Sequence, residues 1–126
     1  MGLMIERQII VVLPVLIVSE PNLRGHWSKR ARRAKAQREA VHWSMHRHQP
    51  PGIDHAPITI RIERCGRGKL DDDNLAAGAK AVRDGVADWL DIDDGSQALR
   101  WVYEQRVDRK LNPHTTVTVT WRENAP

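Results

Sequence analysis

The sequence predicts a single α/β domain in which a mixed β-sheet packs against two helices. Stretches of alternating apolar residues and stretches with helical spacing follow one another in the order β-α-β-α-β-β. The chain has 126 residues, of which 40% are hydrophobic. This is enough for one compact core and too little for two ordinary domains, so we expect one domain spanning residues 1–126.

The first predicted element is a strand in the apolar run Ile9–Val18. Its β-branched residues favour a buried strand, and the run is far shorter than the roughly 20 residues of a membrane helix. No small-residue cleavage pattern of a signal peptide follows it. A helix is predicted next, from about Ser28 as N-cap to His46, because alanine, arginine, lysine and glutamine dominate this stretch.

Two further elements lead into and out of an acidic segment. Ile58, Ile60 and Ile62 alternate with polar residues, which is typical of a strand with one buried face. A second helix is predicted from about Asp73 to Leu90, because apolar residues recur there at helical spacing. These residues are Leu75, Ala79, Val82, Val86 and Leu90.

The last two elements are predicted strands. One covers about Leu99 to Asp108, and the other alternates apolar residues with Thr116, Thr118 and Thr120. Because Asn112-Pro113 supplies a turn between them, we expect the two strands to form a hairpin.

Charge is divided unevenly between two segments. Residues 24–48 hold eight lysines or arginines against one acid, a local charge of +7. Residues 71–94 hold eight aspartates against two basic residues, a local charge of −6. A basic surface attracts phosphate backbones, whereas clustered carboxylates repel them unless a cation lies between. The combination predicts a polyanion held at a metal site.

The acidic segment has the donors of a magnesium site. In an extended segment that leaves a strand, residues two apart point the same way, so we expect Asp71 and Asp73 to converge while Asp72 faces elsewhere. Magnesium takes one or two carboxylates together with waters and phosphate oxygens. Asp93 or Asp94 adds a third ligand if the chain folds back. The alternative is that the aspartates only cap the second helix.

Lys80 lies on the polar side of the second predicted helix, in a stripe with Asp73 and Asp84. Helical side chains lean toward the N-terminus, so its ammonium group is placed to approach a metal-bound phosphate. The alternative is an exposed i,i+4 ion pair with Asp84, worth roughly a few tenths of a kcal/mol.

The acidic segment reads Asp71-x-Asp73-Asn74-Leu75, followed by a lysine and an aspartate on the same helix and by Asp93-Asp94 before a strand. This pattern resembles the RusA-type Holliday junction resolvases. The opening is also similar to that family, since the loop Pro21-Asn22-Leu23-Arg24 follows a strand and precedes a basic helix. Size and element order match over a core of about residues 8–122.

The resemblance implies a homodimeric endonuclease that nicks two strands of a four-way DNA junction symmetrically, using Mg²⁺, with Mn²⁺ as a possible substitute. It makes Asp71, Asp73 and Asp94 the catalytic and metal-binding residues, although Asp72 can replace either neighbour. Lys80 is the counterpart of the family's catalytic lysine. That lysine usually stands three residues after the asparagine, at the position of Ala77 here, so the resemblance implies an insertion of about three residues.

The DNA-binding surface is expected along the first helix and around the acidic segment. Six basic residues fall within the ten positions 29–38, with no acid among them. A solvated helix face is the alternative for such a run. The expected DNA-binding residues are Arg24, Lys29, Arg30, Arg32, Arg33, Lys35, Arg38, Arg67, Lys69 and Asn74.

Cys65 is the only cysteine, which excludes an intrachain disulfide and a cysteine-based zinc site. We therefore expect a reducing, intracellular setting. The resemblance implies the cytoplasm of a bacterial or phage-infected cell, with branched DNA and a second copy of the chain as partners and no membrane. The alternative function is a protein that binds branched or duplex DNA without cleaving it, in which the acidic cluster is structural.

Overall fold

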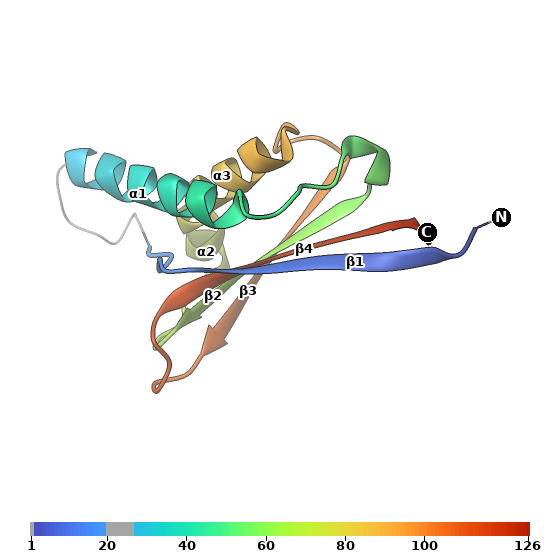
Figure 1. Cartoon of the computed structure of the whole chain (residues 1–126). Coiled ribbons are helices and arrows are strands. Elements are labelled where there is room, and N and C mark those ends of the chain that lie inside the picture. The colour runs from blue at the N-terminus through green and yellow to red at the C-terminus, as the bar shows by residue number, and fades with distance from the viewer. Residues whose placement is uncertain (1, 20–26) are drawn as a thin grey trace.

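A four-stranded mixed sheet carries the fold, and its helices lie on one face (Figure 1). The computed structural model describes residues 2–19 and 27–126. The predicted α/β class and element order are confirmed, with the second predicted helix divided in two. The elements are β1 (Met4–Leu13), α1 (Trp27–Met45), the 3-10 turn η2 (Ile53–His55), β2 (Ile58–Gly66), α2 (Asp72–Gly78), α3 (Lys80–Leu90), β3 (Leu99–Val107) and β4 (His114–Asn124).

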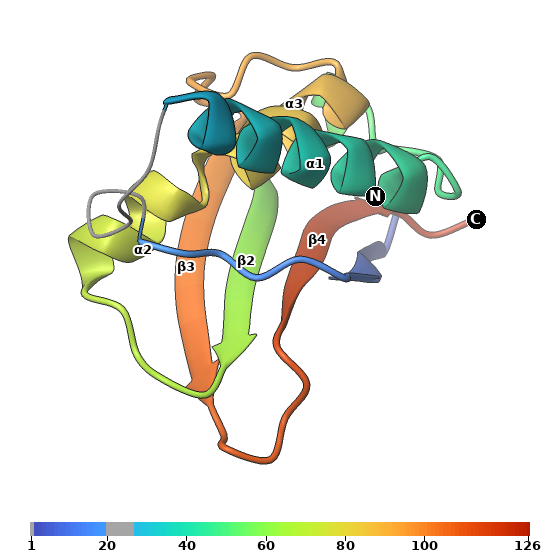
Figure 2. The same ribbon diagram turned by 90° about the vertical axis from the view of Figure 1, so that its left-hand side faces the viewer.

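The strand order in the sheet is β1-β4-β2-β3. β4 runs antiparallel to both β1 and β2, whereas β2 and β3 are parallel (Figure 2). The predicted hairpin between the last two strands is therefore wrong. The helices α2 and α3 form a crossover that makes β3 a parallel neighbour of β2, so β4 pairs with the other edge of β2.

The first strand begins earlier than predicted and is less buried. It ends at Leu13, before Pro14, which has no N–H to donate to a neighbouring strand. β1 is an edge strand, and its side chains Ile10 and Val12 are 58% and 61% exposed. They lie in register with threonines of β4, on the sheet face that carries no helix.

The core fills the space between the sheet and the helices. Ile58, Ile60 and Ile62 of β2 are fully buried, as their alternation predicts. Their neighbours in β4 are Val117 and Val119, which the register places beside Ile62 and Ile60. The apolar stripe predicted along the second helix is buried throughout: Leu75, Ala79, Val82, Val86 and Leu90.

The second predicted helix begins at Asp72 and is interrupted at Ala79, which separates α2 from α3. The interruption lies where the chain segment after β1 presses on the helix. A Cβ atom at Gly78 would collide with the carbonyl oxygen of Val18. Glycine permits this approach and is also a poor helix former, so the helix changes direction at this point.

The helix α1 begins at Trp27, so Ser28 lies inside its first turn and is not the N-cap that the sequence predicts. Its C-terminal half packs on α3 through Val41 and Gly85. A Cβ atom at Gly85 would lie 2.9 Å from the Cβ of Val41, so the absence of a side chain at Gly85 sets the separation of the two helices. This contact holds the basic helix over the junction of α2 and α3.

Candidate metal and nucleic-acid site

The acidic segment starts directly after Leu70, and Leu70 is fixed to β3 by one side chain. The Leu70 N–H donates to Oε1 of Gln105 at 2.9 Å, and Nε2 of Gln105 donates to the Leu70 carbonyl at 2.7 Å. The amide thus pairs with both backbone groups as a neighbouring strand would. The position of Asp71 is therefore set by the edge of the sheet.

One face of β3 holds both acidic segments. Three side chains that alternate along the strand make the contacts. Trp101 contacts the backbone of Asp94, and Tyr103 contacts the side chain of Arg83. Gln105 contacts the backbone of Leu70. Four residues of a strand span about 13 Å, which sets the scale of separation between the two acidic segments. Strand alternation from Trp101 and Tyr103 assigns Gln105 to the same face, so the sequence contained a signal for Gln105 that the predicted site residues did not include.

Asp71 is the N-cap residue of α2, and its carbonyl accepts the N–H of Leu75 at 2.8 Å. Its carboxylate makes no capping hydrogen bond. Asp72 and Asp73 follow in the first turn, and all three aspartates are exposed. No ion pair or side-chain hydrogen bond joins them to another residue in the described ranges. The three carboxylates are consequently uncommitted.

The predicted convergence of Asp71 and Asp73 depends on period-two alternation. It requires an extended segment, but Asp71 is extended and Asp73 is already helical. Period-two alternation therefore does not bring the two carboxylates together. The helix begins early because carboxylates in its first turn favour the positive end of its dipole.

Asp94 is bound by an arginine that the sequence argument overlooked. Its Oδ2 accepts a hydrogen bond from Nε of Arg83 at 2.9 Å, and its carbonyl accepts from Nη2 at 3.0 Å and from the Trp101 indole at 2.8 Å. Nη1 of Arg83 donates to the Tyr103 hydroxyl at 3.0 Å. Burial lowers the pKa of Arg83, but the bonds to Tyr103 and Asp94 outweigh it and raise the pKa above its ordinary value.

The structure does not assemble the three predicted ligands into one cluster. Across residues 2–19 and 27–126, no three His, Cys, Asp or Glu side chains are grouped so that they could hold a metal ion. Asp71 and Asp73 lie at the start of α2, Asp94 lies in the loop before β3, and Asp93 accepts the Gly95 N–H at 3.3 Å.

Lys80 is paired with Asp84, with 3.3 Å between Nζ and Oδ2. This is the i,i+4 pair that the sequence left as an alternative. Lys80 follows the interruption at Ala79, so the continuous helix that would carry it toward Asp73 is absent. Its side chain lines a groove beside α1 instead.

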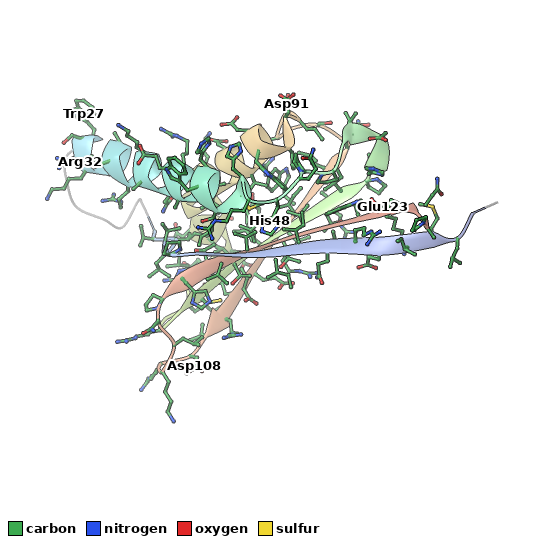
Figure 3. All side chains as sticks on the ribbon, in the orientation of Figure 1. Trp27, Arg32, His48, Asp91, Asp108 and Glu123 are labelled. Atoms are coloured by element: carbon green, nitrogen blue, oxygen red, sulfur yellow. The ribbon has the colours of Figure 1, made fainter. Side chains whose placement is uncertain are left out.

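The predicted DNA-binding residues form two groups. Along α1, the basic side chains are exposed except for the half-buried Arg33, and Figure 3 shows Arg32 near the start of the helix. Arg67 and Lys69 are exposed in the loop before α2, and Asn74 is half-buried within α2. Arg24 lies outside the described residues. The described members of the α1 group are Lys29, Arg30, Arg32, Arg33, Lys35 and Arg38.

Arg64 is a buried guanidinium behind this loop. It is 7% exposed and occupies the buried register of β2 after Ile58, Ile60 and Ile62. Its Nε donates to the carbonyl of Ile17 at 2.6 Å and its Nη1 to that of Gly68 at 2.5 Å. Burial lowers the pKa of Arg64 from its ordinary value. Arg64 therefore anchors the loop that leads to Asp71, and a charged residue in a buried strand register was the signal for it.

Comparison with known proteins identifies no family. No protein-family model matches the chain, and no curated protein matches it. The solved structure of a cyanuric acid hydrolase is similar, with a TM-score of 0.43 and 10% identity, over 98% of this chain and 39% of that chain. The chain thus spans about two fifths of the hydrolase, and a likeness this distant carries no argument about activity. Within the described residues, no helix is both long and apolar enough to cross a membrane.

Proposed function

We propose that this protein is a magnesium-dependent endonuclease that resolves four-way DNA junctions by paired, symmetric nicks. The observation that carries the proposal is the set of three uncommitted carboxylates at Asp71, Asp72 and Asp73. Their segment is held to the sheet by Gln105 and Arg64, in a chain of net charge +4. An anchored group of unpaired anions is unfavourable alone and favourable with a hard cation and a phosphate.

The donors fit magnesium, which uses one or two carboxylates plus waters and substrate phosphate in preference to a full protein cage. Asp71 and Asp73 would hold it, with Asp72 able to replace one of them. Asp94, whose Oδ2 is bound by Arg83, lies apart from these aspartates. When bound, the ion supplies Lewis-acid polarisation of the scissile phosphate and orients water for attack.

The protein's own side chains bind and position the substrate. The arginines and lysines of α1 bind backbone phosphates away from the scissile bond, and Arg67 and Lys69 do so beside it. Gln105 and Arg64 keep the acidic segment in place, so that little reorganisation is needed when the phosphate arrives.

Paired nicking requires two sites, so the proposal includes a homodimer. The edge strand β1 leaves a row of backbone groups unpaired within the described sheet, and Ile10 and Val12 are exposed on it. Such an edge is a ready surface for pairing with a second copy. A monomer mass from light scattering at micromolar concentration would contradict this part.

The second candidate function is junction or duplex binding without cleavage. It is favoured by one observation: Asp94 and Lys80, two of the four predicted catalytic residues, are engaged by Arg83 and Asp84. In that case the acidic segment is structural, and neutralising it would leave DNA affinity unchanged or increase it.

The test uses a synthetic four-way junction labelled in turn on each of its four strands. With Mg²⁺, we expect nicks at symmetric positions of two opposing strands, leaving 5′-phosphates. With Ca²⁺ or EDTA, we expect binding and no nicks. If the protein binds the junction and never nicks it under any divalent ion, the binding-only function is correct.

A further inference from the structure

A groove separates α1 from the junction of α2 and α3, apart from the acidic segment. Its volume is about 290 Å³. Arg30, Gln37 and Arg38 line it from α1, and Lys80 and Asp84 line it from α3. The groove exists because α1 approaches α3 closely only further along, at Val41 and Gly85.

The groove is cationic. Arg30 and Arg38 are exposed, and neither forms an ion pair with another residue of the described ranges. Lys80 contacts Asp84 at 3.3 Å, through a side chain that is 77% exposed. Three cations and one carboxylate leave a net charge of +2 along the groove.

Gln37 makes the groove more than a charged surface. It is 6% exposed and lines the groove, yet its amide has no hydrogen bond to a described residue. The polar atoms of this amide are not fully buried, so they remain accessible at the groove. An accessible amide N–H beside two guanidinium groups and an ammonium group makes a set of donors that suits an anionic acceptor.

We propose that this groove binds a phosphate group of a nucleic-acid backbone, with Gln37 as the donor at its base. A phosphate presents several charged oxygens and so can accept from two arginines and an amide at once. The position of this site along the DNA rests on the proposed function. The helix α2 separates the groove from the acidic segment and has seven residues, which span about 10 Å at the rise of a helix. DNA advances by about 3.4 Å per nucleotide of one strand. The bound phosphate thus lies about three nucleotides from the acidic segment.

The first test removes the charge. Arg30→Gln with Arg38→Gln is compared with Arg100→Gln with Arg122→Gln, a strand variant that removes the same charge from exposed positions of β3 and β4 at the end of the sheet opposite Gly66. Affinity for a four-way junction is measured without magnesium over a range of salt. We expect the groove variant to bind about tenfold more weakly at about 0.1 M salt, and its salt slope to fall by about two. The strand variant should change either quantity far less.

The second test uses substitutions of opposite sign. Asp84→Asn removes the only carboxylate that lines the groove in the described residues and should strengthen binding several-fold. Gln37→Met keeps the side-chain size, removes the amide and should weaken binding several-fold at unchanged charge. A purely structural role for these residues predicts no strengthening by Asp84→Asn.

Nicking is measured separately with magnesium, so that the two proposals can fail independently. If the junction is never nicked but the groove variants alter affinity as described, the groove stands and the endonuclease does not. If nicking occurs and the groove and strand variants bind equally, the groove proposal is wrong. Inorganic phosphate is also titrated into the protein, and its binding is followed through the NMR signal of the Gln37 side-chain amide. If this signal shifts with phosphate but the groove variants do not alter DNA binding, nucleic acid is not the ligand of the groove.

Discussion

Gln105 and Leu70 form a reciprocal pair, in which one side-chain amide both accepts from and donates to the backbone of the residue before Asp71, at 2.9 and 2.7 Å. The pair joins the end of the β2–α2 connection to the edge strand β3. It is the most direct link between the sheet and the proposed metal site.

Gln105→Met keeps the side-chain volume but leaves both backbone groups of Leu70 without their partner. We expect the free energy of unfolding to fall by about 1–3 kcal/mol and the nicking rate to fall more than junction affinity does. Gln105→Glu, which keeps one acceptor and loses the donor, should have an intermediate effect. Urea denaturation and single-turnover nicking measure the two quantities. Unchanged stability in Gln105→Met would show that the pair is not a restraint.

The helices and strands that depend only on the periodicity of apolar residues could be predicted from the sequence. β2, β4 and the apolar stripe of α2 and α3 follow from alternation and helical spacing, because each buries a face against a core. The hairpin was not predictable in this way, because strand order depends on which edge the α2–α3 crossover leaves free. The interruption at Ala79 depends on contact between Gly78 and Val18, sixty residues apart in sequence.

The acidic residues of the candidate site could be predicted from the sequence, whereas the residues that bind or anchor them could not. The aspartates are visible as residue types, and their exposure follows from their charge. Arg83 binds Asp94 only because α3 returns the chain to β3, so no local pattern points to the pair. Arg64 and Gln105 were visible as polar residues in strand registers that face the helices, and alternation extended to the strand ends would have found both.

Arg83→Lys keeps the charge and removes the guanidinium fork that contacts Asp94 and Tyr103. We expect a loss of about 1–3 kcal/mol in the free energy of unfolding, measured by urea denaturation. Lys80→Gln is the matched control, because it removes an exposed i,i+4 pair and should cost less than about 0.5 kcal/mol. Equal effects of the two substitutions would contradict a structural role for the Arg83 network.

Gly85→Ala places a Cβ atom 2.9 Å from the Cβ of Val41 and forces α1 away from α3. We expect it to lower the free energy of unfolding by about 1–3 kcal/mol. At Gly95 a Cβ atom would meet nothing within 4 Å, so Gly95→Ala should change stability by less than about 0.5 kcal/mol. The melting temperatures of the two variants give the comparison, and a neutral Gly85→Ala would mean that the helices are less closely packed than described.

Hydrogen bonds from Trp121 and Arg7 lower the pKa of Glu123 from its ordinary value of 4.5. Because the folded state holds the proton more weakly than the unfolded state, Glu123 contributes stability above pH 4.5 that is lost as the pH falls through the lowered pKa. The difference in unfolding free energy between wild type and Glu123→Gln should therefore be largest above pH 4.5 and shrink in more acidic buffer. A difference that is constant with pH would contradict this assignment.

The rate of junction nicking under single-turnover conditions tests the proposed function most directly. It is measured with and without Mg²⁺ for wild type, Asp73→Asn and Asp88→Asn, the last an exposed aspartate of α3 outside the proposed site. We expect magnesium-dependent nicking by wild type and Asp88→Asn, and a loss of at least about a hundredfold in Asp73→Asn with junction affinity retained. Nicking by Asp73→Asn at the wild-type rate, or by none of the three proteins, would contradict the assignment of this chain as a magnesium-dependent junction endonuclease.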